Sequence, residues 1–311
     1  MKKCFIKPFL FFTIFIITMP FISLKVQANE QNEEKEEIFY TNLNGVELTK
    51  KQYNNLLRGF DEDTIATMEI EMSDNFKNND SLLRDDTIIY VKVERTYLNG
   101  MVIDSTETTV SEEEYLNSDL SKEVLANDVI LSLMSSGNTG QPTHETTYKK
   151  IKISVVHSSL SDKAVTLTNE WKQLPAIRSY DVLAIIPYNN SGGTMVSTKS
   201  GYQKWDGNTI NYSSSSGNFK TSNGGVGLSQ KLESGASTSI TNSLTVYFLN
   251  SGNPFTARGS YQHATSNITL SQSQNYTLSS SGMGGVISFN SSVASYFDDT
   301  QGVQITSYRP F

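Results

Sequence analysis

The three histidines are the first residues to examine for chemistry, because imidazole is both a metal ligand and a general base near neutral pH. They are His144, His157 and His263. None lies three or four residues from another histidine, a cysteine or a glutamate in a stretch of helical periodicity, which is the spacing that common zinc sites require. The sequence therefore predicts no metal site, and it implies no cofactor.

Serine is abundant, but a serine hydrolase places its nucleophile in a Gly-x-Ser-x-Gly turn between a strand and a helix. No such pentapeptide occurs, and the glycine-rich 281–286 leads into a predicted strand, so it offers no helix N-terminus to a phosphate. Glu170 and Asp181 flank the densest apolar stretch and are the best candidates for acid–base catalysis. Because an ordinary carboxylate at a strand edge or turn explains each of them more simply, we predict that the protein is not an enzyme.

Aromatic and uncharged polar side chains suit a different task, the binding of a neutral ligand. Two aromatic candidates lie beside the Asp206–Gly207 turn, and the polar candidates belong to an uncharged row that alternates with apolar residues over 264–279. The candidate binding residues are Trp205, Tyr202, Thr265, Asn267, Thr269 and Asn275. Trp171 and Tyr180 are instead expected in the core.

The first residues predict export. Lys2 and Lys3, the apolar run from Phe9 to Met19 and the small-residue pattern ending at Ala28 are typical of a secretory signal peptide, residues 1–28. The apolar run is too short to span a bilayer, which needs about 20 residues. Cleavage after Ala28 removes the only cysteine, so we expect a secreted chain without disulfides and without a constitutive membrane span.

Charge is unevenly distributed along the chain. Residues 29–150 contain 25 Asp and Glu against 11 Lys and Arg, a net charge of −14, whereas 151–311 contain 7 against 10, a net charge of +3. Nucleic acid is not expected as a partner, because phosphate binding needs a concentrated basic surface. The contrast predicts contact between the chain's own two parts, held by charge and weakened by salt.

The acidic region, residues 29–134, mixes helices and strands. Thr49 can cap a helix whose apolar face is Tyr53, Leu56, Leu57 and Phe60, and a second helix after Asp61 places Ile65, Met68 and Met72 together. Two strand-like runs then surround Asn99–Gly100, a signal for a tight hairpin, and Ser111 with Glu114 has capping-box spacing.

Residues 135–149 lose hydrophobic periodicity and gain Gly, Ser, Thr and Pro, which predicts a linker. The region 150–311 is almost wholly strand-like. Its predicted strands are 150–158, 163–173, 179–187, 201–205, 208–213, 225–232, 236–249, 255–265, 267–279, 284–297 and 302–308. The fold class is therefore mainly β: an antiparallel, jelly-roll-like β-sandwich preceded by a small acidic α+β region.

The strand predicted at 236–249 alternates apolar with hydroxyl-bearing residues, so it has a hydroxyl face. Three roles for that face remain open: contact with water in a soluble sandwich, recognition of a polymer, or the lining of a pore. A permanent membrane barrel is disfavoured, because Gln272 and Gln274 of the strand predicted at 267–279 would lie near mid-bilayer. One hairpin, 224–249, approaches the roughly 9 to 11 residues per arm that a spanning strand needs.

Four stretches resemble a group of secreted two-part proteins of Gram-positive bacteria of the Bacillus and Clostridium type. They are NGVELTKKQYNNLLRGF, EWKQLPAIRSYDVLAI, GSYQHATSNITL and GGVISFN. The resemblance implies export and a two-part layout, and it carries over no catalytic residue. The amino-terminal part is also similar to leaders of some bacteriocin precursors.

The sequence thus predicts a secreted, non-enzymatic protein whose sandwich binds a cell-surface or extracellular ligand, such as a glycan or cell-wall polymer. The acidic region would shield the sandwich or aid its folding. The alternative is the precursor of a secreted toxin or antimicrobial, activated by cleavage in the linker, with hairpin 224–249 as its pore-forming element.

Overall fold

The computed structural model describes residues 37–118, 142–188, 194–281, 285–299 and 301–310. The predicted signal peptide, residues 1–28, and the first part of the predicted linker, residues 135–141, lie outside these ranges. Residues 37–311 form one compact unit.

The unit begins with a short two-stranded sheet, and three short helices follow it. These elements are β1 (Ile38–Thr41), β2 (Glu47–Thr49), α1 (Lys50–Leu56), α2 (Glu62–Ala66) and α3 (Ile70–Phe76). Thr49 caps α1 as predicted: its Oγ1 accepts from the backbone N–H of Gln52, whose side chain accepts from the N–H of Thr49. The single helix predicted after Asp61 is two short helices, and its apolar residues are buried as predicted.

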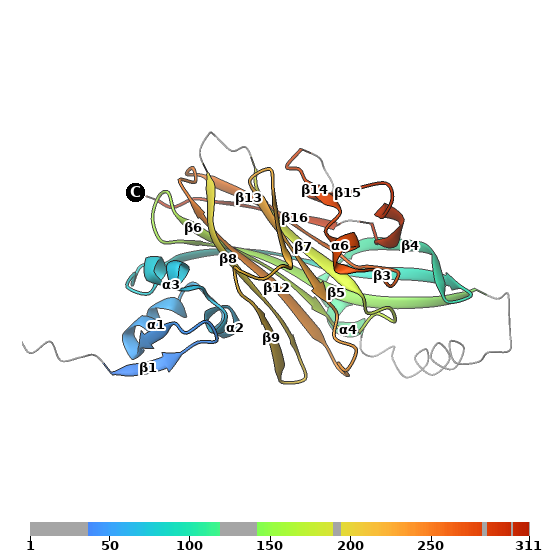
Figure 1. Cartoon of the computed structure of the whole chain (residues 1–311), viewed down its shortest axis with the longest axis horizontal. Helices are drawn as coiled ribbons and strands as arrows, with labels where there is room; N and C mark the ends of the chain where they lie inside the picture. The colour runs from blue at the N-terminus through green and yellow to red at the C-terminus, as the bar shows by residue number, and fades with distance from the viewer. Residues whose placement is uncertain (1–36, 119–141, 189–193, 282–284, 300, 311) are drawn as a thin grey trace, which may run out of the picture. The chain divides into compact units, whose positions relative to one another are not determined.

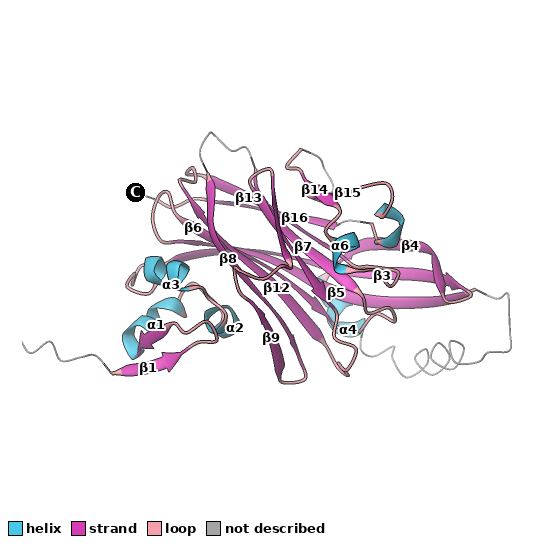
Figure 2. Cartoon of the chain, viewed as in Figure 1, coloured by secondary structure: helices cyan, strands magenta, loops and turns pink. Residues whose placement is uncertain are grey.

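Two antiparallel sheets follow, so the predicted sandwich is confirmed (Figures 1 and 2). The seven-stranded sheet has the order β4 (Met101–Val110), β3 (Leu83–Leu98), β5 (Thr143–His157), β6 (Lys163–Trp171), β12 (Ile240–Leu249), β8 (Met195–Trp205) and β9 (Asn208–Tyr212). The five-stranded sheet has the order β10 (Phe219–Ser222), β11 (Gly225–Lys231), β7 (Tyr180–Pro187), β13 (Phe255–Gln262) and β16 (Gln301–Ser307).

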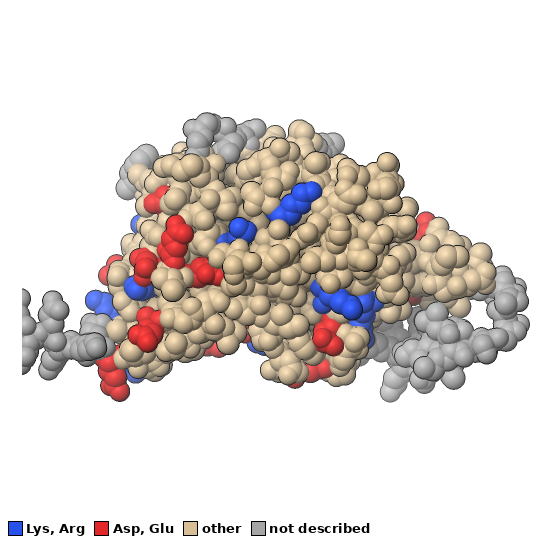
Figure 3. Space-filling view, viewed as in Figure 1, with Lys and Arg blue, Asp and Glu red and all other residues tan. Residues whose placement is uncertain are grey.

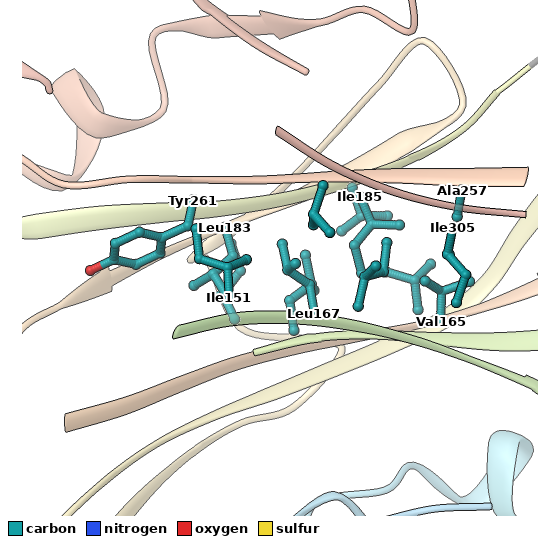
Figure 4. Close-up of a cluster of buried hydrophobic side chains, with 14 of the residues drawn as sticks. Ile151, Val165, Leu167, Leu183, Ile185, Ala257, Tyr261 and Ile305 are labelled. Atoms are coloured by element: carbon teal, nitrogen blue, oxygen red, sulfur yellow. The ribbon is translucent and has the colours of Figure 1, made fainter. Parts of the chain in front are cut away.

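Alternate residues of both sheets meet in one apolar core. Ile151 of β5, Leu167 of β6 and Leu183 of β7 are completely buried there, and side chains from the two sheets interdigitate (Figure 4). Burial of each such side chain contributes about 1.5–3 kcal/mol. Gly259 of β13 permits this close approach, because a Cβ there would lie 2.9 Å from a methyl group of Leu167. Apolar contact between the sheets therefore holds the sandwich together.

The predicted hairpin at Asn99–Gly100 is confirmed and belongs to the seven-stranded sheet. Both turn residues have positive φ, 53° and 76°, as a tight primed turn requires. Strand β3 pairs with β5 over the whole length of β5, from Leu83 opposite His157 to Tyr97 opposite Thr143. Residues 143–149 of the predicted linker are consequently part of β5, and one sheet contains strands from both sides of that segment.

An outer layer, residues 264–297, covers the five-stranded sheet. The strand predicted at 267–279 is wrong: the chain forms α6 (Leu270–Ser273) and then β14 (Tyr276–Leu278). Thr269 and Gln272 form a capping box, and this local hydrogen bonding prevails over the alternating pattern. The strand predicted at 284–297 is only β15 (Ile287–Phe289), followed by a short 3-10 helix, η2 (Ala294–Tyr296). One more helix, α4 (Glu112–Asn117), follows β4, and Ser111 caps it as predicted.

The predicted hairpin 224–249 does not form. Its arms are β11 in the five-stranded sheet and β12 in the seven-stranded sheet, so they lie in opposite layers and do not pair with each other. The apolar faces of the arms meet across the core, where Leu228 and Leu244 are both buried. A pore built from this hairpin would require the core itself to open, and we do not propose one.

Candidate functional site

The hydroxyl face of β12 is covered by the amino-terminal helices. Thr245 and Thr166 of the neighbouring strand have their hydroxyl oxygens 3.1 Å apart, and both side chains are buried. Beside them, Tyr247 packs edge-on against Phe76 of α3, with ring centroids 5.5 Å apart. This part of the face is neither open to water nor the lining of a pore; it is the surface on which the helices pack.

Acidic side chains of α2 and its N-cap pair with basic side chains of the sheet. Asp61 lies 3.1 Å from Arg84 and 2.9 Å from Lys152, and Asp63 lies 2.8 Å from Lys204. The pairs of Asp61 with Lys152 and of Asp63 with Lys204 join the two parts, so the contact predicted from the charge contrast is present. Ion pairs are only part of it, because an apolar cluster buries side chains of both parts, namely Val46, Leu48, Leu56, Phe60, Ile65, Met68, Met72, Phe76, Leu82, Val156, Ala164 and Tyr247.

A small polar crevice with essentially no enclosed volume lies where α2 meets the sheet. Its lining residues are Gly59, Phe60, Asp61, Thr64, Arg84, Ser154 and Thr166. Ligand pockets for molecules of drug size measure roughly 300–1,000 Å³, so this crevice is too small to enclose one. The guanidinium of Arg84 in the crevice is already paired with Asp61 and Asp86.

Cleavage of the chain within 119–141 is expected to leave the two pieces associated. The continuous β3–β5 ladder and the apolar cluster join them, and salt screens neither of these. A protease recognition sequence inserted there, followed by gel filtration in about 1 M NaCl, tests this, since exposed ion pairs are largely screened at that concentration. Separation of the pieces in salt would instead show that charge alone holds them.

The structure does not bring the six predicted binding residues together. Tyr202 is buried on β8, and Trp205 is half-buried against the small cluster of Leu232, Ala236 and Ile240. The other four lie in or beside the outer layer on the opposite sheet. There Thr265 is buried, Asn267 and Thr269 are exposed, and Asn275 is half-buried.

Asn275 belongs to an amide cluster on this outer layer. The backbone N–H of Asn290 donates to the carbonyl of Asn275 at 3.0 Å, their side-chain amides also bond, and Asn275 Nδ2 lies 3.5 Å from Ser292 Oγ. The half-buried ring of Phe289 stacks on Phe297 with centroids 3.7 Å apart. The cluster thus combines amide donors and acceptors with a partly accessible aromatic ring.

The outer layer carries no formal charge. No Asp, Glu, Lys, Arg or His occurs between His263 and Asp298. In Figure 3 acidic side chains gather over α1–α3, at the left, whereas the surface over α6, β14 and β15 is mostly uncharged. The layer's apolar residues, Tyr276 and Leu278 among them, pack on Val182 and Ala184 of β7.

A second group of polar residues lies inside the sandwich, and we call it the charged cluster. Its members are Arg95, Glu107, Glu145, Lys149, Asp181, His263 and Asp298. The Arg95 guanidinium lies 2.5 Å from Asp298 and 3.0 Å from Glu145, and its side chain is only 1% exposed. Lys149 pairs with Glu107, and both of their side chains are fully buried.

Burial and pairing act in opposite directions on these carboxyl groups. Burial alone would raise the pKa of Asp298, but the adjacent Arg95 guanidinium holds it at about 2. For Glu107 burial prevails over the attraction of Lys149, and the pKa of the carboxyl is raised. Asp181 accepts hydrogen bonds from Tyr261 and from the backbone N–H of Ala264, and it lies 2.8 Å from Nδ1 of His263.

The Asp181–His263 pair has the composition of an acid–base dyad, but its position does not suit catalysis. The two side chains are 0% and 1% exposed, so no substrate reaches them in this conformation. Glu170, the other carboxylate singled out from the sequence, pairs with Lys150 at 2.5 Å and is partly exposed. Among the described residues, no group of three or more His, Cys, Asp or Glu side chains is arranged to hold a metal ion.

Sequence reasoning named Asp181 and His263 singly but missed the charged cluster to which they belong, although a signal for Arg95 and Lys149 exists. Arg95 shares the inward parity of Val91 and Val93, and Lys149 shares that of Ile151 and Ile153. A charge at an inward position of a strand must find a partner, because an unpaired buried charge is costly. Asp298 gives no such signal, because it follows an irregular segment.

Comparisons with known proteins identify no family. No family model and no curated protein matches the chain. Among solved structures, the collagen-binding domain of a Staphylococcus aureus adhesin has a TM-score of 0.27 at 8% identity, covering 49% of this chain and 90% of that one. The collagen-binding subdomain of the Enterococcus faecalis surface protein ACE has a TM-score of 0.25 at 9% identity, covering 48% and 87%.

A third structure, AvmM, which catalyses macrocyclization in alchivemycin A biosynthesis, has a TM-score of 0.25 at 10% identity, covering 49% of this chain and 82% of that one. TM-scores this low establish no shared fold, so the architecture rests on the chain's own strand pairing. No helix within the described ranges is long and apolar enough to cross a membrane.

Proposed function

We propose that the protein is exported and binds a neutral extracellular polymer, a glycan or cell-wall polysaccharide, without catalysing a reaction. The observation that supports this most directly is the outer layer, which presents hydroxyl and amide groups without formal charge. A neutral polysaccharide offers many hydroxyl groups, each able to donate and accept one modest hydrogen bond. The amide cluster with Phe289 is the part of the layer that best combines polar contacts and a ring.

The amino-terminal helices act in this proposal as a permanent cover. Phe60 and Phe76 are almost fully buried against the sheet, so removing the helices would expose a large apolar surface. This supports a role as a folding aid for the sandwich. It also leaves the ligand surface on the opposite sheet, away from the helices.

The test is retention of the mature chain, residues 29–311, on insoluble peptidoglycan and on a neutral glycan array. The variant N267A/N290A removes two exposed amides and should reduce retention about tenfold, since each lost hydrogen bond costs roughly 0.5–1.5 kcal/mol. T108A, at an exposed position of edge strand β4 in the other sheet, is the matched control and should bind like the original chain. Absence of retention on every surface, or equal retention of N267A/N290A, contradicts the proposal.

A further inference from the structure

Three aromatic rings meet at the start of the helical region, and a β-bulge brings them together. In the β1–β2 pair, Ile38 lies opposite Thr49 and Tyr40 opposite Leu48, so β1 contains one extra residue at Phe39. A bulge re-aims side chains that would otherwise alternate between the two faces of a strand. Consequently both Phe39 and Tyr40 contact Tyr53 of α1, with ring centroids 5.6 Å and 5.0 Å away. We call these three residues the aromatic trio.

The aromatic trio is accessible. Phe39 is 54% exposed, and Tyr40 and Tyr53 are half-buried. The ring planes are tilted by 58° and 49°, so the rings are not stacked face to face and do not cover one another's faces. Tyr40 and Tyr53 pack against the edge of the apolar cluster that contains Leu48 and Leu56, whereas Phe39 lies outside that cluster.

Carboxylates lie beside the trio. Burial and then the negative charge of Glu62 raise the pKa of Tyr53. The pKa of Tyr40 is raised by burial, then by Tyr53, and then by Asp63 and Glu62. Asp63 is already paired with Lys204, whereas Glu62 is exposed at the first turn of α2. The two tyrosine side chains therefore lie within electrostatic reach of Glu62.

We propose that the aromatic trio, with Glu62 at its rim, binds an organic cation of the quaternary or methylated ammonium class. The negative faces of aromatic rings attract a diffuse cation, and several rings together form the usual site for a quaternary ammonium group. A carboxylate at the rim adds a long-range attraction that a neutral ligand would not feel. A small metal ion would not suit this site, because it needs oxygen ligands in a closed shell.

The test compares two probes of the same shape. Tetramethylammonium or choline is titrated into the mature chain, and NMR shifts of Phe39, Tyr40 and Tyr53 are followed, with the uncharged choline analogue 3,3-dimethylbutan-1-ol as the second probe. The cation should shift these three residues, and the uncharged analogue should bind at least threefold more weakly. F39A should raise the dissociation constant about three- to tenfold, which is the loss of one ring at a partly exposed site.

Controls separate this site from a general apolar patch and from the proposed polymer site. I38A removes an equally exposed side chain without a ring, and Y53F keeps the ring without its hydroxyl, so both should bind as before. N290A, in the outer layer, should also have no effect. E62Q should weaken binding of the cation alone. Equal binding of the uncharged analogue, an unchanged dissociation constant for F39A, or no shift with either cation overturns the proposal.

Discussion

Replacement of Arg95 by methionine will lower the free energy of unfolding by about 3–5 kcal/mol, the cost of leaving buried carboxylates without their partner. Arg95 Nη2 lies 2.5 Å from Asp298 and Nη1 lies 3.0 Å from Glu145, while the guanidinium also lies 5.6 Å from the ring centre of Trp171. Methionine restores part of the volume but cannot neutralise either carboxylate. Urea unfolding of the mature chain measures the difference.

Arg84→Met is the matched control for this prediction. Arg84 also pairs with two carboxylates, Asp61 and Asp86, but these are 47% and 39% exposed. Water replaces the lost partner there, so the cost should be no more than about 1 kcal/mol. The double variant R95M/D298N should recover part of the loss, because it removes the most buried of the stranded charges. A cost for R95M no greater than that for R84M would show that the charged cluster is better hydrated than its burial indicates.

The prediction for Arg95 concerns the contact between the acidic region and the carboxyl-terminal segment. Arg95 lies on β3 of the acidic region, and Asp298 lies just before the last strand, 203 positions later. Ser105 of β4 donates to the same carboxylate at 2.6 Å, so both strands of the β3–β4 hairpin are fixed to the carboxyl-terminal segment. The predicted division into an acidic region and a separate sandwich therefore describes composition better than it describes packing.

The strands with regular alternation were predictable, because period-two patterning depends only on which face is buried. Strands β6, β7 and β11 begin and end within two residues of their predicted limits. The segment 267–279 alternates equally well, yet the capping box of Thr269 and Gln272 makes it helical. Alternation of apolar and polar residues could not decide between a strand and a helix here, because the capping residues occupy positions that also fit a strand.

The candidate sites were less accessible to sequence reasoning than the fold. Asn275 was chosen for its place in an uncharged row, and the structure shows it in contact with Asn290 instead of with the other chosen residues. The aromatic trio depends on a β-bulge, for which Ile38–Tyr40 gives no clear sequence signal. Side-chain clusters assembled from distant segments require coordinates, because pairing partners and bulges follow from the whole fold.

A second large effect is expected from pH and a single histidine. His157 is fully buried at the end of β5, and its Nε2 contacts the hydroxyl of Ser307. That hydroxyl donates its one proton to Asp85 Oδ2 at 2.5 Å, so the imidazole must donate from Nε2–H. Its Nδ1 is buried without a hydrogen-bond partner. Protonation of Nδ1 would therefore bury a positive charge and an N–H donor that has no acceptor.

Burial, followed by the positive charge of Lys163, lowers the pKa of His157 from the ordinary value of 6.5 to about 4. The unfolded chain therefore takes up this proton as the pH falls below 6.5, while the folded chain does so only near 4. The stability that neutral His157 contributes is fully present above the unfolded pKa of 6.5. It is lost progressively as the pH falls to the folded pKa of about 4, and the total loss is on the order of 3 kcal/mol.

The variant H157Q removes this titration while keeping an N–H donor for Ser307. Urea unfolding of both chains between about pH 7 and about pH 4.5 should show a clearly smaller loss of stability for H157Q. H144Q, at the exposed start of the same strand, should keep the pH dependence of the original chain. The difference between the two chains isolates His157, because the other titrating groups, including Glu107 with its raised pKa and Asp298 with its pKa of about 2, are present in both. Equal slopes for H157Q and the original chain would mean that water or movement of β16 accommodates the imidazolium.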